Sequence, residues 1–175
     1  NSIPVRAADS FGSGKGADVP TALNRGASGI DGLIASGCGY SSSLKRAVTI
    51  LLGDLSAIHD LNSFKLLSDS EYPILLVLIN NQGGGIFSLL PIADHTKIFE
   101  NFFVTPHSHN FQGIAKMFNL DYFNPKSIND FELDYKNAVS KNKSAVIEIF
   151  SERKNISKIF KDVRENINKN IFAHS

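Results

Sequence analysis

The sequence has a single cysteine, almost no net charge and no long apolar run. Because Cys38 has no second cysteine to pair with, no disulfide can form within the chain, as is typical of proteins from a reducing compartment. The 18 basic and 17 acidic residues give a net charge of +1, which predicts neither nucleic acid nor a membrane surface as a partner. No apolar run approaches the roughly 18 residues of a membrane span, and no signal peptide opens the sequence. We therefore expect a cytoplasmic protein.

Two glycine-rich nucleotide-binding motifs are also missing. The segment GGGIFS, which begins at Gly83, lacks the last glycine of G-x-G-x-x-G, and the motif G-x-x-x-x-G-K-[S/T] does not occur. The sequence therefore supports neither a dinucleotide-binding Rossmann site nor a P-loop.

The chain does have enough apolar sequence for one globular domain. Its 175 residues are 42% hydrophobic and 20% charged, which are ordinary values for a domain with a buried core. It starts at Asn1 without an initiator methionine, and the opening NSIPVR reads as the middle of a protein. We expect residues 1–175 to form a single domain that is a fragment of a longer protein.

Three short apolar runs predict buried parallel strands: AVTILLGD from Ala47, YPILLVLINN from Tyr72 and SAVIEIF from Ser144. They are rich in Val, Ile and Leu and do not alternate with polar residues, as expected of strands with helices on both faces. Helical patterns lie between them, so the expected fold class is α/β, an open, mainly parallel sheet with helices on both faces. In such sheets ligands bind beyond the carboxyl ends of the strands.

The helical patterns lead to local expectations. SAIHDLNSFKLLS places apolar residues three apart on one face of one helix. Asn110 and Ser127 are candidate N-caps, the second with Asp130 three residues further on. The tail from Ile156 to Ile167 is expected to form an amphipathic helix that packs back on the domain. GSGKGAD near residue 15 is expected to be a flexible surface loop.

Polar residues follow two of the predicted strands. Asp54 and Asn81 lie 81 − 54 = 27 positions apart, the length of one strand–helix–strand unit, which would bring both to the same edge of the sheet. Mg²⁺ prefers about six oxygen ligands at roughly 2.0–2.1 Å. A carboxylate, an amide oxygen and a backbone carbonyl would supply half of that shell, and a diphosphate and a water the rest. Gly83, Gly84 and Gly85 permit a sharp turn that aims a carbonyl at the metal and N–H groups at phosphate. Each feature alone is commonly an ordinary turn, but their combination and spacing favour a metal and diphosphate site.

These residues resemble the signature of thiamine-diphosphate enzymes, in which Gly-Asp is followed about 27 residues later by Asn-Asn. The segments NSIPVR, NRGASGIDG, GDLSAIHDLN, NNQGGGIFSLLP and FENFFVTPH occur in the order found in the third domain of the MenD family. That family comprises the 2-succinyl-5-enolpyruvyl-6-hydroxy-3-cyclohexene-1-carboxylate synthases of menaquinone biosynthesis. The resemblance covers roughly residues 1–150. Generic relatives have Gly-Asp-Gly where this chain has Gly53-Asp54-Leu55.

The resemblance implies a cofactor, a metal and two substrates. Thiamine diphosphate would be held through Mg²⁺ or Mn²⁺, with Asp54, Asn81 and the carbonyl of Gly83 as metal ligands. The implied cofactor-binding residues are Ile30, Gly53, Leu55, Ser56, Asn81, Gly83, Gly84, Ile86, Phe87 and Leu90. Ser2, Arg6 and Arg25 match positions that contact carboxylates of the substrates, which suits the dianions 2-oxoglutarate and isochorismate because Arg binds carboxylates in a bidentate manner.

The resemblance also implies a transferase whose catalytic glutamate lies elsewhere. The reaction would decarboxylate 2-oxoglutarate and add the succinyl-semialdehyde unit to isochorismate, on the way to menaquinone or phylloquinone. The glutamate that activates the cofactor would come from the pyrimidine-binding domain of the partner subunit in a homodimer or homotetramer. Four glutamates of this chain do not match the position of that activating glutamate: Glu71, Glu100, Glu132 and Glu148. We therefore expect no catalytic residue here, and a chain that is the C-terminal third of a larger enzyme and inactive alone. In a photosynthetic eukaryote the expected location is the plastid stroma.

The remaining candidate residues are assigned ordinary roles. His107 and His109 are expected on a surface loop, since no third soft metal ligand lies near this pair in the sequence. His59 and His95 are assigned no functional role. Cys38 is expected to be a small packing residue. Two alternatives stay open: another thiamine-diphosphate enzyme, such as a pyruvate-type decarboxylase or acetolactate synthase, and a non-catalytic α/β binding domain.

Overall fold

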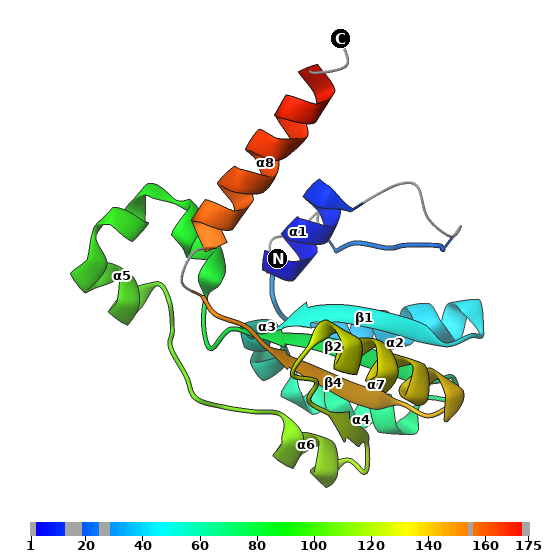
Figure 1. Ribbon diagram of the computed structural model, residues 1–175. Coiled ribbons are helices and arrows are strands. Elements are labelled where there is room, and N and C mark those ends of the chain that lie inside the picture. Colours follow the sequence, from blue (N-terminus) through cyan, green and yellow to red (C-terminus); the bar gives the residue numbers. More distant parts are fainter. Residues whose placement is uncertain (1–2, 13–18, 25–28, 154–155, 173–175) are drawn as a thin grey trace.

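The sheet has four parallel strands in the order β1-β2-β4-β3. The computed structural model describes residues 3–12, 19–24, 29–153 and 156–172, with residues 170–172 described by their backbone alone. The strands are β1 (Val48–Gly53), β2 (Ile74–Asn80), β3 (Asp121–Phe123) and β4 (Ala145–Phe150), and each neighbouring pair runs parallel (Figure 1). The expected fold class is confirmed. The sequence did not indicate β3, because three residues are too few to show a periodic pattern.

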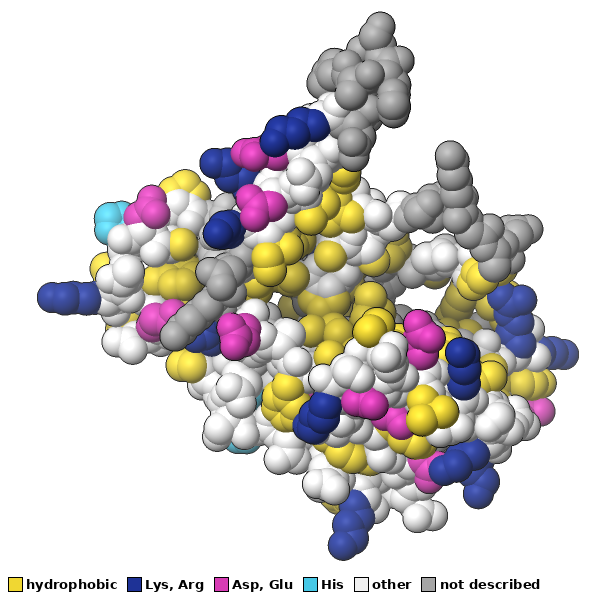
Figure 2. Space-filling model, in the orientation of Figure 1, with side chains coloured by type: hydrophobic (Ala, Val, Ile, Leu, Met, Phe, Trp, Pro, Cys, Tyr) yellow, Lys and Arg dark blue, Asp and Glu magenta, His cyan; other side chains and the backbone are white. Residues whose placement is uncertain are grey.

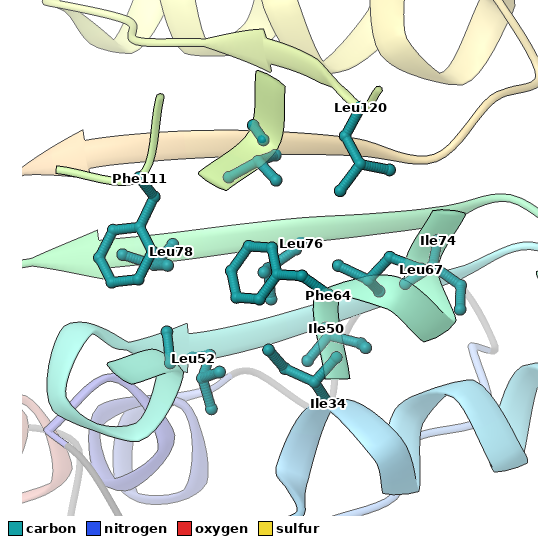
Figure 3. Packing of buried hydrophobic residues seen from close by; sticks show 13 residues of the cluster. Ile34, Ile50, Leu52, Phe64, Leu67, Ile74, Leu76, Leu78, Phe111 and Leu120 are labelled. Carbon is teal, nitrogen blue, oxygen red and sulfur yellow. The ribbon is translucent and has the colours of Figure 1, made fainter. Parts of the chain in front are cut away.

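Helices cover both faces of this sheet. The larger core lies under α2 (Leu33–Leu44), α3 (Asp54–His59), α4 (Phe64–Asp69) and α6 (Gln112–Met117), and the smaller core under α7 (Ile128–Ser140). In Figure 3, Phe64 and Phe111 pack over β2, their rings stacked with centroids 6.1 Å apart. Successive residues of β2 face opposite cores, and both cores consist of hydrophobic residues, so its apolar run does not alternate with polar residues. Those facing the larger core are Ile74, Leu76 and Leu78, and those facing the smaller are Leu75 and Val77.

The spacing of apolar residues predicted one helix over residues 56–68, and this prediction is wrong. The segment divides into the end of α3, a 3₁₀ turn η1 (Leu61–Ser63) and α4. The break lies at Asp60, whose buried carboxylate accepts the backbone N–H of Ile34 at 2.7 Å and the hydroxyl of Ser63 at 2.6 Å. The first of these bonds ties the break to the start of α2, a distant segment that local periodicity cannot reveal. Phe64 and Leu67 are buried nonetheless.

Of the two predicted helix caps, Ser127 lies at the N-cap position and Asn110 lies one residue before it. The Ser127 hydroxyl accepts the N–H of Asp130 at 3.1 Å at the start of α7, so this cap is confirmed. Helix α6 begins one residue later than expected, with Phe111 at the N-cap position. The Asn110 side chain still accepts the N–H of Gln112 at 3.2 Å and so supports the first turn.

The C-terminal helix α8 (Ile156–Phe172) contacts the domain mainly near its start. Ile156 is buried, and the ring of Phe160 meets Phe11 of α1 (Ile3–Phe11) edge-on with centroids 5.1 Å apart. Ile159, between these two contacts, is 55% exposed, and Ile167 near the end of the helix is 41% exposed. Figure 1 shows α8 projecting away from the sheet. The expectation that the whole tail packs back on the domain is therefore wrong beyond these contacts.

Between β2 and α6 the chain makes an excursion of short elements: η2 (Gly85–Leu89), η3 (Pro91–Asp94) and α5 (Thr96–Phe102). This excursion returns to the carboxyl end of the sheet and positions the site described next. The expected loop at residues 13–18 lies outside the described residues. Within the described part of the chain, no helix combines the length and apolar character needed to span a membrane.

Candidate metal and diphosphate site

Asp54 and Asn81 lie at the carboxyl ends of adjacent strands. Asp54 directly follows β1 as the first residue of α3, and Asn81 directly follows β2. Because β1 and β2 are parallel neighbours, with Gly53 opposite Ile79, the spacing of 27 residues does bring both to one edge of the sheet. The Asp54 side chain is almost completely buried.

The Asp54 carboxylate links the two strand ends. Its Oδ1 accepts the N–H of Leu55 at 2.7 Å, and its Oδ2 accepts the N–H of Gly83 at 3.0 Å. The second bond joins the end of β1 to the glycine turn after β2. A carboxylate oxygen has further lone pairs, so these bonds leave Asp54 able to bind a cation.

Three oxygens converge at this edge of the sheet. The side-chain oxygen of Asn81 lies 3.2 Å from Asp54 Oδ2 and 2.6 Å from the carbonyl oxygen of Gly83. Three acceptors so close together repel unless a donor or a cation lies among them. Turning the Asn81 amide would make its NH₂ donate to both other oxygens. A divalent cation would instead keep the oxygen inward, because neighbouring ligands of an octahedral Mg²⁺ lie about 2.9 Å apart when each metal–oxygen distance is about 2.05 Å. The donor set and spacing therefore fit Mg²⁺ or Mn²⁺.

The glycine turn, residues 83–85, lies so close to neighbouring backbone and side-chain atoms that there is no room for a side chain on it. Gly83 has φ +146°, and a Cβ there would lie 2.8 Å from the carbonyl oxygen of Val104 and 2.7 Å from Arg153 Nη1. A Cβ on Gly85 would lie 2.7 Å from Asn81 Nδ2. Gly84 donates its N–H to the Val104 carbonyl at 2.6 Å. The turn thus aims the Gly83 carbonyl at Asn81 and is held from behind by the loop after α5.

A cavity of about 330 Å³ opens beside these oxygens. All the residues that the sequence predicts to bind the cofactor or the metal line it, namely Ile30, Gly53, Asp54, Leu55, Ser56, Asn81, Gly83, Gly84, Ile86, Phe87 and Leu90. Arg6 of α1 lines it too. Figure 2 shows hydrophobic side chains gathered between α8, α1 and the sheet. The cavity therefore combines a polar end with apolar walls.

Two buried polar atoms of the cavity residues lack a hydrogen-bond partner among the described residues: Ser56 Oγ and Arg6 Nε. A buried donor without a partner costs free energy, so such groups in a cavity are candidates for ligand contacts. The other two expected substrate contacts, Ser2 and Arg25, lie outside the described residues.

His107 was expected on a surface loop, and that expectation is wrong. Its side chain is only 7% exposed, and its Nε2 lies 3.2 Å from Asp54 Oδ2. The alignment is not that of a hydrogen bond. Fifty-three positions (107 − 54) separate the two residues, and no local motif signals their contact. His109 is exposed, as expected, and His59 at the end of α3 and His95 are exposed as well. Across the described residues, no group of three or more His, Cys, Asp or Glu side chains forms a metal site.

Cys38 has the properties expected of a packing residue. It is half-buried and packs against the larger core. Burial, with a smaller contribution from the charge of Asp60, raises the pKa of its thiol to about 11. A thiol with so high a pKa is a poor nucleophile at neutral pH. None of the four glutamates considered from the sequence lines the cavity.

Comparisons with known proteins show the family to which this chain is similar. Residues 18–149 match the family of the thiamine pyrophosphate enzyme, C-terminal TPP binding domain. The chain is 46% identical over 154 residues to the 2-succinyl-5-enolpyruvyl-6-hydroxy-3-cyclohexene-1-carboxylate synthase of Prosthecochloris aestuarii. The matched residues are 87% of this chain and 27% of that synthase. The chain is 44% identical over 154 residues to the synthase of the same name from Rubrobacter xylanophilus, covering 88% and 26%. The chain thus spans about a quarter of the length of these curated relatives.

A solved structure supports the fold. The crystal structure of benzoylformate decarboxylase from Polynucleobacter necessarius aligns with a TM-score of 0.58 over 70% of this chain and 23% of that one. At 15% identity, this likeness concerns the fold alone. The resemblance to the MenD family is confirmed by the sequence similarity. By its match over most of its length, the chain belongs to the thiamine pyrophosphate enzymes, as their C-terminal TPP-binding domain.

Proposed function

We propose that this chain is the cofactor-binding part of a larger carboligase that decarboxylates 2-oxoglutarate and adds the succinyl-semialdehyde unit to isochorismate. The similarity to the curated synthases supports this substrate pair. The observation that carries the proposal is the convergence of the Asp54 carboxylate, the Asn81 side-chain amide and the Gly83 carbonyl at the polar end of a mostly apolar cavity.

In this proposal Mg²⁺ or Mn²⁺ binds the three oxygens and holds the diphosphate of the cofactor. Ser56 donates its unpartnered hydroxyl to the diphosphate, since it lines the same cavity two residues after Asp54. A hard cation suits this all-oxygen set, and it would neutralise the charge that the diphosphate brings into a largely buried place.

When bound, thiamine diphosphate would supply the carbanion chemistry that breaks and forms the carbon–carbon bonds. The chain's own residues position it and exclude water. Ile30, Ile86, Phe87 and Leu90 supply the apolar part of the cavity wall. A dry wall strengthens the electrostatic interactions made inside the site.

Arg6 is proposed to bind a substrate carboxylate together with Ser2 and Arg25. Its support is the buried Nε without a partner among the described residues, on the wall of the cavity that holds the metal ligands. A guanidinium fork matches the two oxygens of a carboxylate, which 2-oxoglutarate and isochorismate both carry.

The activating glutamate is proposed to lie on a pyrimidine-binding domain of a partner subunit, in a dimer or tetramer. Apolar side chains left exposed near the cavity support a covering partner. Leu89 and Leu90 on its wall are 37% and 51% exposed. We also propose a cytoplasmic location, or the plastid stroma in a photosynthetic eukaryote, which agrees with the single free cysteine.

Calorimetric titration with thiamine diphosphate, with and without Mg²⁺, tests the proposal. We expect binding that needs the metal and that Asp54→Ala abolishes. Asp162→Ala, which removes an exposed carboxylate of α8, is the matched control and should bind as the unaltered protein does. Equal binding without Mg²⁺, or full binding by Asp54→Ala, would contradict the proposal that a metal ion holds the diphosphate. Such a result would favour a non-catalytic α/β binding domain.

A further inference from the structure

Glu148 is a completely buried carboxylate that the proposed function does not use. It lies in β4 at 0% exposure. Its Oε1 accepts the side-chain N–H of Asn80 at 2.6 Å, and its Oε2 accepts the N–H of Phe111 at 3.0 Å and the hydroxyl of Tyr122 at 2.6 Å. These three donors are neutral groups from the end of β2, the start of α6 and β3. Burying a carboxylate is costly unless it is fully hydrogen-bonded, so this arrangement calls for a reason.

The first arm of the network leads to Asn81 and Gly83. Asn80 precedes the proposed metal ligand Asn81, and its side chain is fully buried. Its Nδ2 bonds to Glu148, while its Oδ1 accepts the N–H of Gln82 at 3.1 Å. The side chain of Asn80 therefore holds the backbone on both sides of Asn81. It also fixes the turn from which the Gly83 carbonyl points.

The second arm leads to Asp54. Glu148 holds the N–H of Phe111, and Asn80 Nδ2 also donates to the carbonyl of His109 at 2.9 Å. These bonds anchor the segment that carries His107 against Asp54 at 3.2 Å. His107 Nδ1 accepts the N–H of His109 at 3.2 Å, which fixes the ring with its Nε2 towards Asp54. One buried carboxylate thus braces the surroundings of all three converging oxygens.

We propose that Glu148 is a positioning residue for the metal site: it holds the ends of β1 and β2 at the separation that a divalent cation needs. This inference rests on the proposed function. Hydrogen-bonding partners behind metal ligands typically change metal affinity 10–100-fold when altered. A purely structural Glu148 would instead lower stability and leave the affinity of the folded protein unchanged.

Glu148→Gln tests the inference because it keeps the shape and loses one acceptor. If the new NH₂ takes the place of Oε1, it faces the NH₂ of Asn80. If it takes the place of Oε2, it faces the N–H of Phe111. Either orientation breaks one arm, although the Tyr122 hydroxyl can turn to accept.

Two control variants separate positioning from stability. Glu132→Gln makes the same chemical change at an exposed residue of α7 whose side chain pairs only loosely with Lys136, at 3.8 Å. Leu67→Ala empties a buried position of α4 in the larger core and destabilises the fold without touching the network. All variants are made in the full-length form of the protein. They are titrated with the Mn²⁺ complex of thiamine diphosphate, with bound Mn²⁺ measured by electron paramagnetic resonance, at a temperature where circular dichroism shows each to be folded.

We expect Glu148→Gln to weaken Mn²⁺ binding by about 10-fold or more, while Glu132→Gln and Leu67→Ala bind as the unaltered protein does. Binding by Glu148→Gln within twofold of the unaltered protein overturns the inference, as does an equal loss in Leu67→Ala. If Glu148→Gln does not fold, Asn80→Ala cuts the link to Asn81 and is judged by the same criteria. If the unaltered protein binds no Mn²⁺, the proposed function itself fails, a result distinct from unaltered binding by Glu148→Gln.

Discussion

Replacing Gly83 by alanine should destabilise the protein strongly, because both the backbone angle and the space at this position require glycine. At φ +146° an L side chain is strained, which costs about 1–3 kcal/mol. The new Cβ would also lie 2.8 Å from a backbone oxygen and 2.9 Å from the Cγ1 of Val104, and relieving such overpacking costs about 1–3 kcal/mol. Together we expect a loss of about 2–6 kcal/mol, a large part of the roughly 5–15 kcal/mol that stabilise a typical domain.

Equilibrium unfolding in urea, followed by circular dichroism, measures this loss. With a slope of about 1–3 kcal/mol per M, the midpoint should fall by on the order of 1 M or more. Gly39→Ala is the matched control: it lies inside α2, where a Cβ would meet nothing within 4 Å, so it should be neutral or stabilise by about 0.5–1 kcal/mol. If Gly83→Ala unfolds within 0.5 kcal/mol of the unaltered chain (about the scatter of neutral surface substitutions), the close approach inferred at the glycine turn is wrong.

Three further predictions concern the site and its surroundings. Ser56→Ala should leave the free energy of unfolding unchanged or raise it by about 1 kcal/mol, because a buried hydroxyl without a described partner is lost. It should also weaken binding of the Mg²⁺ complex of thiamine diphosphate by about 10-fold, and calorimetry showing unchanged affinity would remove Ser56 from the diphosphate site. Burial, followed by the hydrogen bond to Glu148, raises the pKa of Tyr122 above its ordinary value of 10. The folded state therefore holds this proton more tightly, and stability should fall as the pH rises above about 10. Tyr122→Phe should flatten that fall in urea unfolding at alkaline pH, and an unchanged slope would refute the assignment. Finally, the 175-residue chain alone should show no carboligation of 2-oxoglutarate with isochorismate, since none of the glutamates considered lines its cavity. Measurable product from the purified chain would overturn this.

Much of the fold could be read from local patterns. The run Ile74–Ile79 predicted a strand covered on both faces because its successive residues are all apolar, and the two sides of β2 do face separate cores. Asp54 and Asn81 could be paired from their spacing, since a parallel strand–helix–strand unit brings its carboxyl ends to one edge. The Ser127 cap was predicted because a cap depends on residues three positions apart. β3 escaped notice because three residues carry too little pattern.

By itself, the sequence determined the α/β class, the edge of the sheet where the polar residues meet, and the need for glycine at the turn. Each of these depends on periodicity, chain length or backbone chemistry within one structural unit. Only the tertiary structure decided that Asp60 divides a helix to bond Ile34, that His107 lies buried against Asp54, and that Glu148 gathers donors from three elements. The physical reason is that a buried polar group is satisfied by whichever donor the fold brings within about 3 Å. Such a donor can lie anywhere along the chain, so the sequence around the buried group does not indicate which residue it is.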